Sequence, residues 1–127
     1  MSKTVVYSSQ APEPIGPYSQ AIQAGNMLFI SGQIAIQKSS GNILTGSIEE
    51  ETQQVMHNLS EILKAAGMDF SNVVKSTIFL KDMNNFPKVN DIYGQHFKQQ
   101  PPARETVEVA RLPKDVNVEI SCIAVKS

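Results

Sequence analysis

Residues 101–127 read PPARETVEVARLPKDVNVEISCIAVKS, and this stretch decides the fold. Two segments rich in β-branched residues flank Leu112-Pro113-Lys114-Asp115, where proline and aspartate supply turn chemistry. The pattern predicts a β-hairpin whose two strands pair with each other. Alternation along the second strand places one set of apolar residues on a single face: Val116, Val118, Ile120, Cys122 and Ala124.

The opposite face of this second strand is polar at its start, with Asn117, Glu119 and Ser121. In the first strand, Arg104 and Thr106 share a face. If Arg104 and Glu119 point into one crevice, they can hold a small carboxylate and a water molecule side by side. The alternative for Arg104 is an interface salt bridge, with Glu119 as a candidate partner.

The composition indicates one ordinary folded domain that spans residues 1–127. With 41% hydrophobic residues, 18% charged residues and a net charge of -1, neither disorder nor a broad nucleic-acid surface is expected. The single cysteine, Cys122, excludes an intrachain disulfide and is expected to be a buried, inert thiol. The sequence contains no stretch typical of a membrane span or secretory signal, so we expect an intracellular, cytoplasmic protein.

The first third of the chain predicts three strands. A strand over 4–8 precedes a proline-stiffened loop over 10–18, and strands over 19–24 and 27–33 form a hairpin around Gly25-Asn26. The run over 27–30 is continuously apolar, which is typical of a central strand buried on both faces.

The middle of the chain predicts two helices separated by a strand. Ser47 is a suitable N-cap, apolar residues recur at helical spacing from Ile48 to Ala66, and Gly67 is a stop signal. A strand over 73–80 and a helix over roughly 83–97 follow. The order βββαβαββ therefore predicts an α+β fold, in which two helices cover one face of a single mixed sheet.

Two helices cannot cover both faces of this sheet. Because the strands at 27–30 and 73–80 look apolar on both faces, we expect another copy of the chain to bury the far face. The polar residues Arg104 and Glu119 would then lie between subunits, where small-molecule sites are common.

Three further residues allow more than one interpretation. Gly32 either lets a ligand approach the backbone or marks a β-bulge or packing requirement. His57 falls outside the apolar stripe of its helix and is given no role. His96 borders the second stripe and has acid–base potential near neutral pH, but the surface interpretation is preferred.

Several motifs together resemble the RidA, or YjgF-like, family of reactive intermediate deaminases: IGPYSQA at 15–21, SGQI at 31–34, VVKSTIFLKDMNNFPKVNDIY at 73–93, and PPARETVEVARLPKDVNVEISCIAV at 101–125. The resemblance covers essentially the whole chain. It implies a chorismate-mutase-like fold and a homotrimer with sites between subunits. It also implies hydrolysis of 2-iminobutanoate and 2-iminopropanoate to 2-keto acids and ammonia, with no cofactor and no metal.

The resemblance also implies roles for individual residues. Arg104 corresponds to the arginine that binds the substrate carboxylate, and Glu119 to the acid that positions the attacking water. Tyr18 and Gly32 correspond to residues that line the pocket, and Asn90 to a weaker candidate on the second helix.

The chain departs from the family pattern at one position. Where many members have Arg-Ser-Cys, this chain has Arg104-Glu105-Thr106, so Thr106 is expected to line the pocket and to alter its polarity.

Two other functions remain open at this stage. The first is non-catalytic binding of a keto acid or related carboxylate by a regulatory protein. The second is the ribonuclease or chaperone-like activity reported in the family, which a slightly negative chain without tryptophan or a basic stripe does not favour.

Overall fold

A computed structural model describes residues 2–127 and shows one six-stranded sheet with two α-helices. The strand order is β1-β2-β3-β6-β4-β5, and only β4 and β5 pair in parallel. In chain order the elements are β1 (Lys3–Val6), β2 (Ala21–Ala24), β3 (Met27–Gln33), α1 (Ile48–Ala65), β4 (Val73–Leu80), α2 (Phe86–Gly94), β5 (Ala103–Glu108) and β6 (Val118–Val125). Short 3-10 turns lie at Phe70–Asn72, Met83–Asn85 and Pro113–Asp115.

Local sequence signals explain where the elements begin and end. The Ser47 side chain accepts a hydrogen bond from the backbone N–H of Glu50, which caps α1 as predicted. Gly67 ends that helix with a φ of 73°, and Gly25 turns the β2–β3 hairpin with a φ of 61°. Both values lie in the left-handed region, where a side chain would be strained.

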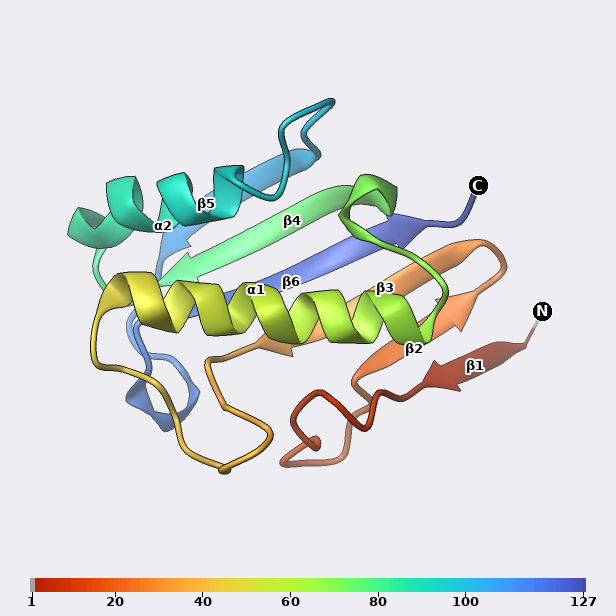
Figure 1. Ribbon diagram of the computed structural model, residues 1–127, viewed down its shortest axis with the longest axis horizontal. Coiled ribbons are helices and arrows are strands. Elements are labelled where there is room, and N and C mark those ends of the chain that lie inside the picture. Colours follow the sequence, from red (N-terminus) through yellow and green to blue (C-terminus); the bar gives the residue numbers. More distant parts are fainter. Residues whose placement is uncertain (1) are drawn as a thin grey trace.

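Both helices lie on the same face of the sheet (Figure 1), as the sequence predicts. Alternate residues of β6 are buried beneath α1, and they form the centre of the core with Leu28, Ile78 and Leu59. This arrangement leaves the other sheet face without a helical layer in the single chain. We call it the open face.

The open face carries apolar side chains that contact no second layer. Phe29 is 42% exposed, and Met27 and Val107 are similarly exposed. In the single chain β3 is buried on one face only, because the exposed Met27 and Phe29 alternate with the buried Leu28 and Ile30. The predicted burial of residues 27–30 on both faces therefore requires a second copy. Burial of the open face by a second copy stays a prediction.

The predicted hairpin of residues 101–127 is also wrong, although both of its strands are present. β4 lies between them, so β6 pairs with β3 and β4, and β5 pairs with β4 alone. The intervening segment crosses the end of β4: Val109 donates a hydrogen bond to the Leu80 carbonyl, and Lys81 donates one to the Asn117 carbonyl. The turn chemistry is real, but it belongs to this crossing, where Lys114 and Asp115 have positive φ.

Within residues 2–127, neither helix combines the length and apolar character that crossing a bilayer requires.

Candidate functional site

Glu119 and Gly32 are in direct contact at an irregularity between β3 and β6. The register shifts between Ile30 and Gln33, so Ser31 and Gly32 together oppose the single residue Ser121, which is a β-bulge. A Cβ atom at Gly32 would lie 2.5 Å from Glu119 Oε2. Both structural interpretations of Gly32 are therefore confirmed: it forms a bulge and makes room for the Glu119 carboxylate.

The Glu119 carboxylate borders a cavity of about 360 Å³ at the end of β3. The loop between β1 and β2 forms one wall through Pro12, Glu13, Pro14, Ile15 and Tyr18, and Ile34, Ile36 and Pro113 contribute apolar surface. Partial burial raises the pKa of Glu119 above the ordinary value for a glutamate. The cavity therefore combines apolar walls with one carboxyl group that holds its proton more strongly than usual.

Tyr18 reaches the cavity because its loop folds back on itself. Its backbone N–H donates to the Gly16 carbonyl at 2.8 Å, and its hydroxyl accepts a hydrogen bond from the Ile15 N–H at 3.4 Å. The predicted neighbourhood of Tyr18, Gly32 and Glu119 thus exists within one chain.

Arg104 lies in a different cavity, of about 420 Å³, on the helix-covered side of the sheet. Its guanidinium is 5.4 Å from the Phe86 ring centroid and 5.1 Å from that of Tyr93, and Nη1 donates to Asn90 Oδ1 at 2.7 Å. Two aromatic faces and a neutral amide thus orient the cation. The pairing of Arg104 with Asn90 leaves its positive charge without a carboxylate partner among the salt bridges of residues 2–127.

Strand register places Arg104 and Glu119 on opposite faces of the sheet. Arg104 is level with Ser76 and, through it, with the buried Cys122 beneath the helices. Glu119 is level with Phe79, which in turn is level with the exposed Val107 on the open face. Cross-strand neighbours share a face, so the crevice that the sequence suggested for Arg104 and Glu119 does not form within one chain.

Thr106 shares the helix-covered face with Arg104 but does not line the cavity around it. Its Oγ1 is buried and finds no hydrogen-bond partner among residues 2–127. Its role as a pocket residue stays a prediction.

Glu51 is a structurally important residue that the sequence analysis missed. This carboxylate on α1 is 0% exposed and accepts hydrogen bonds from Asn117 N at 2.8 Å, Asn117 Nδ2 at 2.7 Å and Val118 N at 3.3 Å. It thereby fixes the start of β6, and with it the segment that carries Glu119. In sequence, Glu51 is one of three successive acids in a first helical turn, and nothing distinguishes it from its neighbours.

His57 and Cys122 lie where the sequence predicts, but the surface position preferred for His96 is wrong, because its ring is half-buried and its Nε2 finds no hydrogen-bond partner among residues 2–127. His57 is exposed on α1, while His96 packs against Phe70 with ring centroids 5.0 Å apart, and burial lowers the pKa of His96. Cys122 is buried, and burial raises the pKa of its thiol to about 11. Among residues 2–127, no group of three His, Cys, Asp or Glu side chains is placed to hold a metal ion.

Comparisons with known proteins agree over nearly the whole chain. A family model described as Endoribonuclease L-PSP matches residues 8–126. A RutC family protein of Pyrococcus horikoshii is 53% identical over 124 residues, covering 98% of each chain. The 2-iminobutanoate/2-iminopropanoate deaminase of Mus musculus is 49% identical, covering 98% of this chain and 92% of its own.

A solved structure shares both fold and sequence with this chain. The structure of E. coli TdcF with bound serine superposes with a TM-score of 0.93 at 38% identity, and the match covers 98% of this chain and 99% of that one. The single mixed sheet with two helices is thus the fold of its relatives.

Proposed function

This chain belongs to the RidA (YjgF-like) family, and from that premise we propose that it hydrolyses 2-imino acids, such as 2-iminobutanoate and 2-iminopropanoate, to 2-keto acids and ammonia. The name of the mouse relative supports the reaction, and the serine bound to TdcF supports a ligand that is a small amino-acid-like carboxylate. The proposed place of action is the cytoplasm.

The single observation that carries the mechanism is the division of the site between two faces. Arg104 and Asn90 lie on one side of the sheet, and Tyr18, Gly32 and Glu119 line a cavity elsewhere. One small substrate cannot contact both halves in the same chain. We therefore infer a homo-oligomer in which Arg104 of one copy meets Glu119 of the next, and the resemblance to the family implies that this oligomer is a trimer. The exposed apolar side chains of the open face support such an assembly.

The chemistry assigns one task to each half. Arg104 binds the substrate carboxylate through its two-pronged guanidinium, and Asn90 holds that guanidinium in place. Glu119 orients a water molecule and accepts its proton as the oxygen attacks the C=N carbon. Glu119 then passes this proton to the nitrogen of the resulting carbinolamine. As the C–N bond breaks, the hydroxyl oxygen forms the C=O bond and returns its proton to Glu119, so that the products are ammonia and a 2-keto acid. Because a protonated imine is already electrophilic, correct orientation of the substrate and the water molecule supplies much of the rate acceleration. The proposed reaction uses no cofactor.

The first test measures the lifetime of 2-iminobutanoate, generated by a threonine dehydratase and trapped with semicarbazide. Wild-type protein should shorten the lifetime, and Arg104→Ala should lose about 100-fold or more of that effect. Arg104→Lys keeps the positive charge but loses the two-pronged guanidinium, so it should retain only a small part of the wild-type effect on the imine lifetime. His57→Gln, on the exposed surface of α1, is the control.

The alternative of a non-catalytic carboxylate-binding protein predicts a different outcome of this test. The wild type would bind 2-oxobutanoate in a manner that depends on Arg104, yet leave the imine lifetime unchanged. That result would overturn the deaminase proposal and establish the binding function.

A second test addresses the shared site. Inactive Arg104→Ala and Glu119→Gln proteins are mixed, dissociated and reassembled. If each site takes Arg104 from one copy and Glu119 from the next, random mixing restores about a quarter of the sites in a closed ring. Restored activity near that level supports the shared site, and no restoration refutes it.

A further inference from the structure

The wall of the Glu119 cavity consists largely of chain without regular secondary structure. Six of its residues come from the loop between β1 and β2, and Ile34 and Ile36 come from the segment after β3. Such segments take up a fixed position only if specific contacts hold them.

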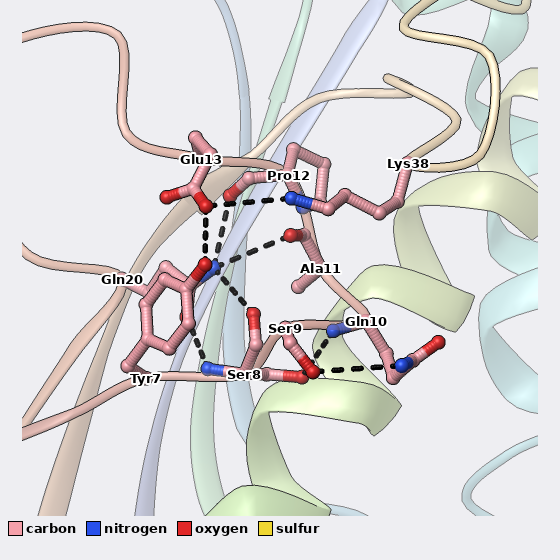
Figure 2. A network of polar contacts seen from close by, with 9 residues as sticks. All are labelled: Tyr7, Ser8, Ser9, Gln10, Ala11, Pro12, Glu13, Gln20 and Lys38. Atoms are coloured by element: carbon pink, nitrogen blue, oxygen red, sulfur yellow. Dashed lines mark hydrogen bonds and ion pairs between the residues drawn. The ribbon is translucent and has the colours of Figure 1, made fainter.

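Gln20 supplies the first set of these contacts. Its side chain is buried, its Oε1 accepts from Ser8 N at 2.6 Å, and its Nε2 donates to the carbonyls of Ser8, Ala11 and Pro12. One amide thus fixes the start of the loop, as Figure 2 shows.

The segment after β3 is held separately. Asn58 of α1 is fully buried, and its Nδ2 donates to the carbonyls of Ile34 and Ile36 at 3.1 and 3.0 Å. Ile36 also pairs with Ile43 in an isolated β-bridge. Lys38 therefore extends from an anchored segment.

Glu13 connects the loop between β1 and β2 with the segment after β3. Its Oε1 accepts a hydrogen bond from the Tyr7 hydroxyl and lies 3.4 Å from Lys38 Nζ (Figure 2). Tyr7 directly follows β1, Glu13 lines the cavity, and Lys38 lies two residues beyond Ile36, which also lines the cavity. One carboxylate oxygen thus joins three parts of the chain around the cavity.

We propose that Tyr7, Glu13 and Lys38 form a clamp that sets the position of the cavity wall, so that Glu13 is a positioning residue for substrate binding although it takes no part in bond making. This inference rests on the proposed function for its effect on substrate, but its effect on the wall is independent of any reaction. The pKa directions agree with the contact: the hydrogen bond from Tyr7 lowers the pKa of Glu13, and the same bond raises the pKa of Tyr7.

The contributions of the two partners differ. The Lys38–Glu13 pair is partly exposed, and exposed ion pairs contribute little. The Tyr7–Glu13 hydrogen bond is exposed as well, but a hydrogen bond to an ionised carboxylate is stronger than one between neutral groups. Loss of the Tyr7 hydroxyl is therefore expected to loosen the wall more than loss of the Lys38 charge.

The test compares steady-state kinetics of Tyr7→Phe, Glu13→Ala, Glu13→Gln and Lys38→Met in the assembled protein. Tyr7→Phe and Glu13→Ala should raise KM about 3- to 10-fold with kcat nearly unchanged, because the clamp acts on binding and not on the chemical step. Glu13→Gln keeps an acceptor oxygen for Tyr7 and should recover most of the loss. Lys38→Met should change KM less than about 2-fold.

Two controls test whether Tyr7 and Glu13 act through one interaction and whether the effect is specific to the cavity wall. The double variant Tyr7→Phe/Glu13→Ala should be no worse than Glu13→Ala alone, because both remove one interaction. Glu49→Ala removes an exposed glutamate that lies 3.9 Å from Lys88, away from the cavity, and should leave KM unchanged. The proposal would be overturned if the effects of Tyr7→Phe and Glu13→Ala on KM were additive in the double variant. It would also be overturned if kcat fell by as large a factor as KM rises.

A second measurement does not depend on turnover. Backbone hydrogen exchange over residues 9–18 should accelerate in Tyr7→Phe and Glu13→Ala but not in Glu49→Ala. Unchanged exchange would refute the clamp, and faster exchange without a KM change would refute its effect on substrate. If the wild type hydrolyses no imine, the proposed function fails, while the exchange data still decide whether the clamp exists.

Discussion

At the scale of single residues, the contact between Gly32 and Glu119 determines the geometry of the candidate site. A side chain at position 32 would occupy the space that the carboxylate fills. The glycine is therefore required by the position of another side chain, and not by a positive φ.

We expect Gly32→Ala to reduce deaminase activity by about 10-fold or more, because a 1 Å displacement of a positioning group has effects of this size. The melting temperature should change little, since the displaced atoms are the free end of a flexible side chain. The measurement is kcat together with Tm. Gly46→Ala is the matched control, as its Cβ would meet only Glu50 atoms at 3.7 Å or more. Full activity in Gly32→Ala would show that Glu119 need not occupy its present position.

Burial of Glu119 also predicts a dependence of stability on pH. Because its pKa is raised in the folded protein, its contribution to stability is fully present below the unfolded pKa and is lost as pH rises through the folded pKa. Glu119→Gln is always neutral, so its Tm should exceed that of the wild type at pH 7, and the difference should vanish below about pH 4. Thermal unfolding at several pH values measures this. A lower Tm for the variant at pH 7 would mean that the assembly stabilises the charged carboxylate.

At the scale of elements, α1 does more than cover the sheet. Its buried Glu51 satisfies two backbone donors and one side-chain donor where the chain enters β6. The contact joins residues that are 66 or 67 positions apart in sequence, and it holds the chain in place at the start of β6.

Removal of this carboxylate should destabilise the protein strongly. Glu51→Ala leaves the buried Val118 N–H and two half-buried donors of Asn117 without an acceptor, at a cost of about 2–4 kcal/mol in the free energy of unfolding. Glu49→Ala, in the same helical turn but exposed, should change it by less than about 0.5 kcal/mol. Denaturant unfolding compares the two variants. Similar stabilities would show that water replaces the lost acceptor.

At the scale of the whole molecule, the open face links assembly to activity. Phe29 lies near its centre, level with Ile22 of β2 and Ile123 of β6. If neighbouring copies bury this face, a charge there must be desolvated on assembly.

Phe29→Asp should therefore dissociate the oligomer, and deaminase activity should fall with it, because each site needs two copies. Light scattering coupled to size exclusion measures the mass, and the imine assay measures the activity. Gln53→Glu adds the same charge on the exposed side of α1 and should preserve both the oligomer mass and the deaminase activity. An active Phe29→Asp monomer would contradict the shared site.

The helices and strands of this protein can be predicted from local sequence signals, to within a few residues at their ends. Caps, turn glycines and apolar periodicity are local signals, so Ser47, Gly25 and Gly67 mark boundaries that the structure confirms. The family motifs likewise identified the relatives, because each motif is a continuous stretch of sequence that can be compared without knowledge of the fold.

Only the tertiary structure decided which segments became neighbours. Residues 101–127 resemble a hairpin, yet β4 separates the two strands. When both strands pair with the buried strand β4, more backbone groups form hydrogen bonds and more apolar surface is buried than when the two strands pair with each other. The register of β5 and β6 against β4 puts Arg104 and Glu119 on opposite faces, and the packing of α1 on the sheet gives Glu51 its three donors. These relations depend on contacts distant in sequence, which no local pattern of residues encodes.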